Sequence, residues 1–140
     1  GNLGTMLRTC DATGAGGVIL VDQCCDPFSL EAVRASMGAL FTRAIAQTSG
    51  PDFFRWLREG PGEVIGATLD TSSIDYRAHR YTAPCFLLMG NEQAGLPVAY
   101  TAQCDALVKM PMKGTADSLN VAVATAVLLY EALGQLEPLA

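Results

Sequence analysis

Short, continuous runs of apolar residues constrain the fold of this chain more than any other feature. The runs are Gly17–Val21, Glu63–Leu69, Pro84–Met89 and Ala106–Met110. Apolar runs of this length are typical of strands that are buried on both faces. Segments with helical signals separate them, as in a mostly parallel sheet with helices on both faces. The sequence therefore predicts an α/β fold, in which ligands bind outside the carboxyl ends of the strands.

The predicted helices are marked by capping residues and by apolar residues at helical spacing. Asp26 suits the N-cap of one helix, and Pro27 suits its first turn. The full set is Asn2–Cys10, a helix that starts at Asp26, Asp52–Arg58, a short helix that opens at Leu96 and Pro97, and Ser118–Leu133. The last helix is apolar nearly all round, and Gly134 is its predicted stop. Such a helix lies at the centre of a fold or at an oligomer interface.

Length, charge and cysteine content limit the class of protein. With 140 residues, the chain is expected to form one domain, residues 1–140. The formal net charge of −5 means that any nucleic-acid contact must come from local basic groups. Five cysteines and a single histidine, His79, show no metal-ligand spacing and indicate reduced thiols. The longest apolar run, Val121–Tyr130, is too short to span a bilayer, so we expect a cytoplasmic protein with no membrane or metal partner.

Two glycine-rich segments resemble phosphate sites only in part. The cluster Gly14-x-Gly16-Gly17 precedes its strand, whereas a dinucleotide-binding fingerprint follows a strand and opens a helix. The segment from Gly90 to Gly95 does follow a strand, but Leu96 and Pro97 stand where a phosphate loop requires Lys and Ser or Thr. Two interpretations of this loop stay open. It is either a tight turn with a solvated Glu92 or a site that binds a small ligand through backbone groups.

Ser118 and Arg8 each have a structural and a functional interpretation. A hydrolase would need Ser118 activated by His79, but a Ser or Asp before a helix is more often a cap, here Asp117 or Ser118. Arg8 lies on the polar side of the first helix, where it is either solvated or in contact with an anion.

Three segments, taken in order, resemble the motifs of a known family. They read NLGTMLRT at residues 2–9, FLLMGNEQAGLP at 86–97 and VKMPMKGTADSLNVAVATAVLLYEA at 108–132. Together they are similar to the SpoU (TrmH-like) ribose 2′-O-methyltransferases of the SPOUT class. The intervening DPFSLEAVRASMGALF, residues 26–41, is also similar, so the likeness covers essentially the whole chain.

This resemblance implies a SPOUT-type α/β knot, a deep C-terminal trefoil knot that holds S-adenosylmethionine, and a homodimer. In the family pattern, Met110 and Leu119 match residues whose backbone groups hold adenine and methionine, which suits a flat, apolar base in an apolar cleft. The implied cofactor-binding residues are Thr68, Met89, Gly90, Asn91, Met110, Met112, Ser118 and Leu119.

The implied activity is methyl transfer to a ribose 2′-hydroxyl of tRNA or rRNA. Arg8 matches the family arginine that helps to activate this hydroxyl, and Asn2, Glu92, Ser118 and Asn120 match the polar residues around it. Because arginine is too basic to act readily as a general base, we interpret Arg8 as a charge that lowers the hydroxyl pKa or binds the adjoining phosphate. Ser118 and Asn120 would orient the acceptor, and Glu92 would hold Arg8 or Asn2.

Family members usually carry an additional RNA-recognition segment, often at the amino terminus, whereas this chain opens on the first motif. We therefore expect a catalytic domain without that segment. The candidate local RNA contacts are Arg34, Arg43, Arg77, Arg80, Lys109 and Lys113. The alternative function is a catalytically silent knotted module that dimerises and binds cofactor or RNA.

Overall fold

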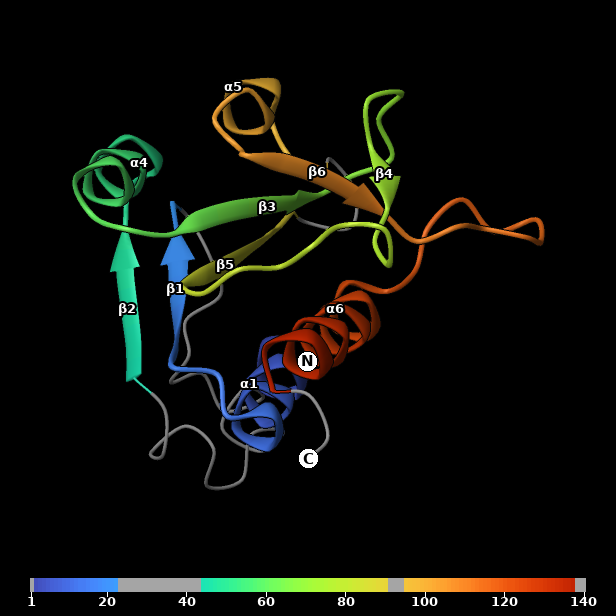
Figure 1. The fold of residues 1–140 in the computed structure, drawn as a ribbon, viewed down its shortest axis with the longest axis horizontal. Coiled ribbons are helices and arrows are strands. Elements are labelled where there is room, and N and C mark those ends of the chain that lie inside the picture. The colour runs from blue at the N-terminus through green and yellow to red at the C-terminus, as the bar shows by residue number, and fades with distance from the viewer. Residues whose placement is uncertain (1, 23–43, 91–94, 138–140) are drawn as a thin grey trace. The chain divides into compact units, whose positions relative to one another are not determined.

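The computed structural model describes residues 2–22, 44–90 and 95–137, which form two compact units, Gly1–Glu59 and Gly60–Ala140. Figure 1 shows the helices and strands of each unit. The α/β class with parallel strands, predicted from the apolar runs, is confirmed. The prediction of a single domain stays a prediction.

The first unit pairs two parallel strands with two helices. Helix α1 spans Asn2–Thr13, and the strands β1 (Gly17–Val21) and β2 (Ala44–Thr48) run parallel from the Gly17–Ala44 pair to the Val21–Thr48 pair. The fully buried Leu7 of α1 packs against Leu3 and Val18, because its apolar face covers β1.

Helix α4 (Gly50–Glu59) follows β2 directly and buries Phe53, Phe54 and Leu57. Asp22, just after β1, has a φ of 62°, and its carboxylate Oδ1 accepts a 2.8 Å hydrogen bond from the Gly50 backbone nitrogen. The end of β1 therefore supports the start of α4.

The second unit is a four-stranded parallel sheet in the order β4-β6-β3-β5. The strands are β3 (Glu63–Ala67), β4 (Ile74–Asp75), β5 (Cys85–Met89) and β6 (Ala106–Lys109), and the helices are α5 (Val98–Thr101) and α6 (Val121–Leu136). Because β3 lies between β5 and β6, its Val64 and Ile65 are almost completely buried.

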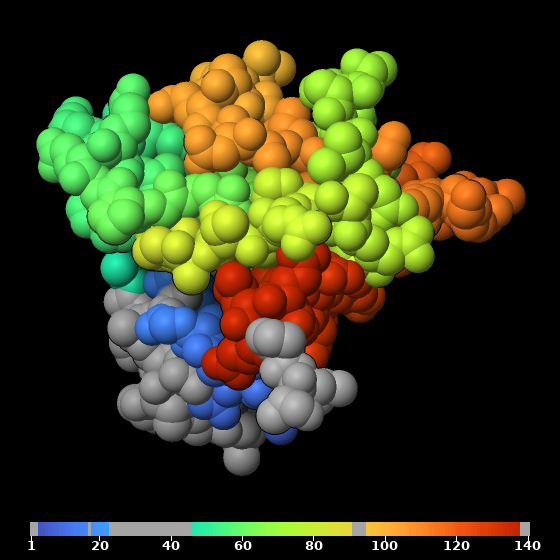
Figure 2. All heavy atoms as spheres, in the orientation of Figure 1, coloured from blue at the N-terminus to red at the C-terminus, as the bar shows by residue number. Residues whose placement is uncertain are grey.

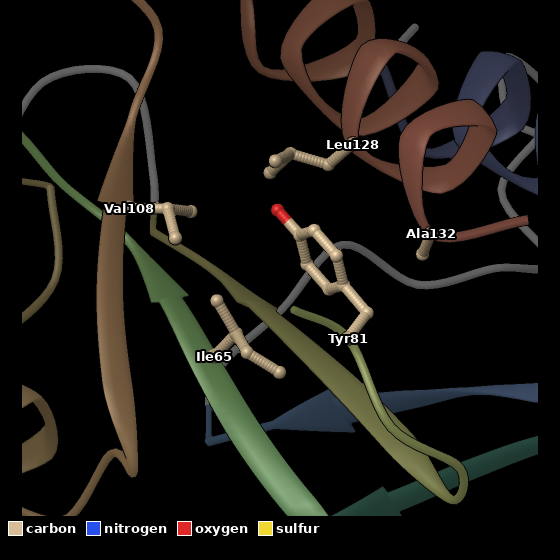
Figure 3. Close-up of a cluster of buried hydrophobic side chains, with 5 residues drawn as sticks. All are labelled: Ile65, Tyr81, Val108, Leu128 and Ala132. Atoms are coloured by element: carbon tan, nitrogen blue, oxygen red, sulfur yellow. The ribbon is translucent and has the colours of Figure 1, made fainter. Parts of the chain in front are cut away.

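The core of the second unit lies between this sheet and α6. Its buried members are Ile65, Tyr81, Val108, Leu128 and Ala132, which Figure 3 shows between the strands and the helix. Successive strand residues face opposite sides of a sheet, so Gly66 faces away from Ile65. A methyl group added at Gly66 would lie 2.9 Å from Cys104 Sγ and 3.2 Å from Leu96 Cδ1. The sheet is therefore packed on both faces.

Several predicted boundaries differ from the structure. Helix α1 continues to Thr13 rather than ending at Cys10. Helix α6 begins at Val121 and passes through Gly134 to Leu136, so the predicted start at Ser118 and stop at Gly134 are wrong. Strands β2 and β4 were not predicted. The helix predicted to start at Asp26 lies outside the described residues.

Candidate functional site

The candidate site is the carboxyl edge of the four-stranded sheet. Because the strands are parallel, their carboxyl ends meet at one edge, where ligands of open α/β sheets bind. Ala67 pairs with Met89 on one side and with Val108 on the other. The residues that follow these strands therefore lie side by side. The edge brings together four of the residues assigned to a cofactor site, Thr68, Met89, Gly90 and Met110.

Thr68 leaves β3 with both of its backbone groups engaged. Its nitrogen donates to the Val108 oxygen at 3.0 Å, and its carbonyl accepts from the Ser73 hydroxyl at 2.8 Å. Ser73 is only 6% exposed and also accepts from the Asp70 nitrogen. These bonds hold the Thr68 backbone in place at the end of β3. The sequence reasoning missed Ser73, although an Asp followed three residues later by Ser is a recognisable turn pattern.

Gly90 follows β5 at a point where no side chain fits. A methyl group on Gly90 would lie 2.4 Å from the Gly95 carbonyl carbon and 2.6 Å from the Leu96 backbone nitrogen. The chain leaves β5 at Gly90 and returns against it at Gly95, so two backbone segments are in direct contact at the sheet edge. Only glycine allows this approach.

The segment from Met110 to Asn120 connects β6 to α6 without regular structure. Met110 packs against the core of the second unit, and Met112 is half-buried. The rest of the segment is exposed, including Ser118 and Leu119. Figure 2 shows its outer part (orange) extending beyond β6.

Asn120 is the N-cap of α6. Its side-chain oxygen accepts hydrogen bonds from the backbone nitrogens of Ala122 and Val123, at 2.8 and 3.3 Å. The interpretation of Asp117 or Ser118 as the cap is therefore wrong, because the helix starts later in the chain. The cap fixes the chain immediately after Ser118 and Leu119.

The remaining catalytic candidates are not all placed. Arg8 is an exposed side chain on α1, in the first unit. Asn2 is the first residue of α1, and Asn91 and Glu92 lie outside the described residues. The structure thus brings together four of the eight cofactor candidates, and the association of Arg8 with Ser118 and Asn120 stays a prediction.

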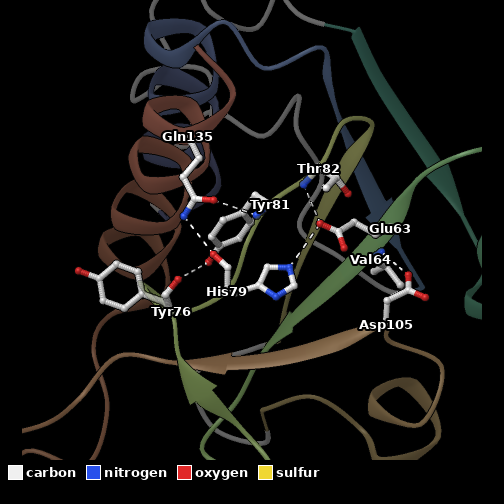
Figure 4. A network of polar contacts seen from close by, with 8 residues as sticks. All are labelled: Glu63, Val64, Tyr76, His79, Tyr81, Thr82, Asp105 and Gln135. Atoms are coloured by element: carbon white, nitrogen blue, oxygen red, sulfur yellow. Dashed lines mark hydrogen bonds and ion pairs between the residues drawn. The ribbon is translucent and has the colours of Figure 1, made fainter. Parts of the chain in front are cut away.

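A polar network holds the chain between β4 and β5 against α6 (Figure 4). The Gln135 side chain accepts from the Tyr81 nitrogen at 2.9 Å and donates to the His79 oxygen at 3.0 Å. The Tyr81 hydroxyl donates to the Tyr76 oxygen at 2.9 Å, and burial raises its pKa. Because α6 also packs on β5, the network fixes the segment between β4 and β5 against this helix.

His79 belongs to this network. Its Nε2 lies 3.3 Å from Glu63 Oε1, and its ring meets the Tyr81 ring edge-on at 4.8 Å. Glu63 Oε1 also accepts from the Thr82 nitrogen. These contacts give His79 a structural role, and they do not support a hydrolase in which it activates Ser118.

An ion pair follows β4 at the same edge. The Arg77 guanidinium donates to Asp75 through Nε at 3.1 Å and through a terminal nitrogen at 2.8 Å. These bonds lower the pKa of the Asp75 carboxyl to about 2. The sequence reasoning named Arg77 as one of six candidate RNA contacts, and it did not single out Asp75.

The cysteines and acidic residues give no sign of redox or metal chemistry in the described part of the chain. Burial raises the pKa of the Cys85 and Cys104 thiols to about 11, which keeps them protonated. Within residues 2–22, 44–90 and 95–137, no three His, Cys, Asp or Glu side chains gather as metal ligands would. None of the helices in these ranges combines the length and apolar character needed to cross a bilayer.

Comparison with known proteins gives consistent matches over nearly the whole chain. A family model described as the SpoU rRNA methylase family matches residues 1–130. A 23S rRNA (uridine(2479)-2′-O)-methyltransferase from Streptomyces viridochromogenes is 36% identical over 140 residues, covering 96% of this chain and 49% of the relative. A 23S rRNA (guanosine(2553)-2′-O)-methyltransferase from Bacillus subtilis is 35% identical over 134 residues, covering 96% of this chain and 54% of the relative.

Solved structures match as well. The crystal structure of an AdoMet-bound rRNA methyltransferase from Sinorhizobium meliloti superposes with a TM-score of 0.92 at 48% identity, covering 99% of this chain and 52% of that one. This chain therefore spans about half the length of the relatives that it matches.

Proposed function

This chain belongs to the SpoU rRNA methylase family, and from that premise we propose that it transfers a methyl group from S-adenosylmethionine to a ribose 2′-hydroxyl of rRNA or tRNA. The observation that carries the proposal is the meeting of Thr68, Met89, Gly90 and Met110 at the carboxyl edge of one parallel sheet. The similar enzymes from Streptomyces and Bacillus are named as ribose 2′-O-methyltransferases.

The chemistry of this edge fits the cofactor. Half-buried Met89, Met110 and Met112 offer an apolar surface to adenine, and Thr68 offers a hydroxyl. Gly90 allows the returning chain to pass close to the cofactor site. We propose the full set of cofactor-binding residues as Thr68, Met89, Gly90, Asn91, Met110, Met112, Ser118 and Leu119. Such a site is compatible with the deep C-terminal trefoil knot of the SPOUT class, which is part of the proposal.

The proposed chemistry needs little from the protein beyond alignment and charge. The bound cofactor supplies an electrophilic methyl group. Arg8 stabilises negative charge on the acceptor hydroxyl oxygen, or holds the neighbouring phosphate. Ser118 and Asn120 orient the acceptor, since the cap of α6 fixes their backbone. Glu92 holds Arg8 or Asn2 in position.

We propose a cytoplasmic homodimer as the working form. Helix α6 exposes Val123, Tyr130 and Leu136, with 51%, 55% and 40% of each residue accessible. Apolar side chains of this size on a helix that also contributes to the core support burial against a second copy.

Calorimetric titration of S-adenosylmethionine and its demethylated product tests the cofactor site without the RNA. We expect one site per chain. Thr68→Val keeps the backbone bonds of Thr68 and should weaken binding roughly two- to tenfold, the effect of one hydrogen bond. Thr101→Val is the matched control, because the Thr101 hydroxyl donates to the Val98 oxygen within α5. Absence of binding to a folded dimer would favour the catalytically silent module.

Arg8→Ala separates catalysis from cofactor binding. We expect methyl transfer to rRNA to be lost while the cofactor titration stays unchanged. Arg55→Ala, which removes an exposed arginine of α4, is the control and should keep both activities. A large loss of cofactor affinity in Arg8→Ala would contradict the role assigned to Arg8.

A further inference from the structure

Arg77 is an exposed arginine whose guanidinium is fixed in place. Asp75 Oδ1 accepts from the Arg77 backbone nitrogen at 2.9 Å and from Nε at 3.1 Å, and Oδ2 accepts from a terminal nitrogen at 2.8 Å. The guanidinium carbon lies 5.7 Å from the centre of the Tyr76 ring. The Arg77 side chain is nevertheless 63% exposed. Two neighbours thus orient the cation, and a large part of it faces solvent.

The Arg55–Asp52 pair on α4 shows what an ordinary surface ion pair looks like here. It has a single contact of 2.9 Å, and the two side chains are 67% and 61% exposed. Such pairs contribute little to stability, because two long side chains lose conformational entropy when they are held in one geometry. Arg77 is held by paired donors on a carboxylate that is only 32% exposed. Its fixed orientation is the kind of geometry that recognises a planar or tetrahedral anion.

The position of Arg77 links it to the candidate site. Asp75 pairs with Lys109 across β4 and β6, and the Tyr76 nitrogen donates to the Lys109 oxygen at 2.9 Å. Met110 comes next in the chain, and both Met110 and Tyr76 pack against the same core. Arg77 therefore lies beside the point at which β6 leads into the segment from Met110 to Asn120.

The local charge favours an anion although the chain as a whole is acidic. Lys113 lies close enough to act electrostatically on Asp75, and Lys109 is the strand partner of Asp75. Glu131 of α6 also acts electrostatically on Arg77, and it accepts a 3.0 Å hydrogen bond from the neutral Gln135 side chain. Three cations thus accompany two carboxylates, within a chain whose formal net charge is −5.

We propose that Arg77, oriented by Asp75 and Tyr76, binds a backbone phosphate of the RNA strand that brings the acceptor ribose to the sheet edge. The inference rests on the proposed function and gives one of its candidate RNA contacts, Arg77, a specific role. Asp75 accepts from two of the guanidinium donors, and the others are available to phosphate oxygens. A phosphate contact positions the strand and carries no sequence preference.

The test is fluorescence anisotropy with a labelled oligouridylate of about 12 nucleotides, titrated at several salt concentrations between about 50 and 200 mM. Arg77→Ala should weaken binding roughly tenfold, the effect of one charge-assisted hydrogen-bonded contact. The slope of log affinity against log salt should become shallower by about 0.7, the value for one phosphate on a single strand. Arg55→Ala removes the same charge from α4 and should change neither quantity.

Asp75→Asn separates orientation from charge. The asparagine keeps one oxygen acceptor but loses the second, and the variant gains one unit of positive charge. A fixed guanidinium predicts weaker RNA binding, whereas tighter binding would show that only the net charge matters and would overturn the proposal. Equal losses in Arg77→Ala and Arg55→Ala would also overturn it, as would competition by millimolar inorganic phosphate that removes binding in wild type and Arg77→Ala alike.

Cofactor titration on the same variants keeps this inference apart from the proposed function. Arg77→Ala should bind S-adenosylmethionine like the wild type. If the wild type binds the oligonucleotide through Arg77 but binds no cofactor, the methyltransferase proposal fails and the phosphate contact stands. If cofactor binds and the Arg77 variant retains full RNA affinity and salt slope, the phosphate contact fails.

Discussion

Helices α4 and α6 distribute their apolar side chains in opposite ways. Helix α4 buries Phe53, Phe54 and Leu57 and exposes Arg55, so that one face packs and the other is solvated. Helix α6 carries one charged residue, Glu131, within Val121–Leu136, and it is apolar on its buried and exposed sides alike. A helix that only covers its own unit needs a single apolar face. The second apolar face of α6 is the observation on which the proposed homodimer rests.

The largest expected effect on stability is in α4, the helix with one buried and one solvated face. Phe54 is 2% exposed and Trp56 is 55% exposed, so these two aromatic residues of α4 represent its buried and its solvated face. Phe54→Ala should lower the free energy of unfolding by about 3 to 5 kcal/mol, because a cavity replaces a packed ring. Trp56→Ala should change it by less than about 0.5 kcal/mol. Urea unfolding of both variants measures this contrast, and equal losses would contradict the division of α4 into two faces.

The buried side of α6 should behave in the same way. Leu128 is 1% exposed and lies against Tyr81 and Val108 in the core. Leu128→Ala should cost about 2 to 5 kcal/mol in urea unfolding, depending on how far the site collapses. A loss below about 1 kcal/mol would mean that α6 packs loosely on the sheet and that its two sides do not differ.

The exposed sides of α6 and α4 should differ in their effect on dimerisation. If a second copy covers it, Tyr130→Asp should raise the dimer dissociation constant at least about tenfold, because a charge would be buried at the interface. Trp56→Asp, an equally exposed aromatic on α4, should leave it unchanged. Sedimentation equilibrium measures both. A wild type that stays monomeric at high concentration would refute the interpretation of α6.

Substitutions at the N-terminal ends of α6 and α4 should have the smallest effect on stability. Asn120 caps α6 through two backbone nitrogens, whereas α4 begins with Asp52 bonded to the Ser49 hydroxyl and Gly50 bonded to Asp22. Asn120→Ala should lower stability by about 1 kcal/mol, and Asn120→Asp should preserve it. Ser49→Ala should cost less, since Asp22 still supports α4. If Asn120→Asp keeps stability but loses methyl transfer, the amide has a role beyond capping.

The strands were predictable where the apolar character of consecutive side chains marked them. Buried parallel strands such as β3 and β5 read as continuous apolar runs. Strand β2 escaped prediction because Gln47 and Thr48 interrupt its apolar character, and β4 has only two residues. Gly134 was a plausible helix stop, because glycine often ends a helix in the left-handed conformation. Here its φ is not positive, and α6 continues through it to Leu136.

The site was predictable from the family resemblance and less so from the residues themselves. The family motifs assign Gly90 and Met110 to one cofactor site, and the parallel register puts them at the carboxyl ends of β5 and β6, on either side of β3. The pairing of His79 with Glu63 joins residues 16 positions apart, and the Arg77–Asp75 geometry depends on the turn after β4. Such contacts arise from tertiary structure and leave no spacing signal in one sequence.

The close approach at Gly90 has a consequence for how this protein tolerates change. A side chain at position 90 meets the backbone of Gly95 and Leu96, which cannot rotate away as a flexible side chain would. At Gly134, nothing lies within 4 Å of an added methyl group. A library that randomises both codons and selects for folded protein should therefore return glycine alone at position 90 and many residues at position 134. Alanine should be among the best there, since it favours a helix over glycine by about 1 kcal/mol.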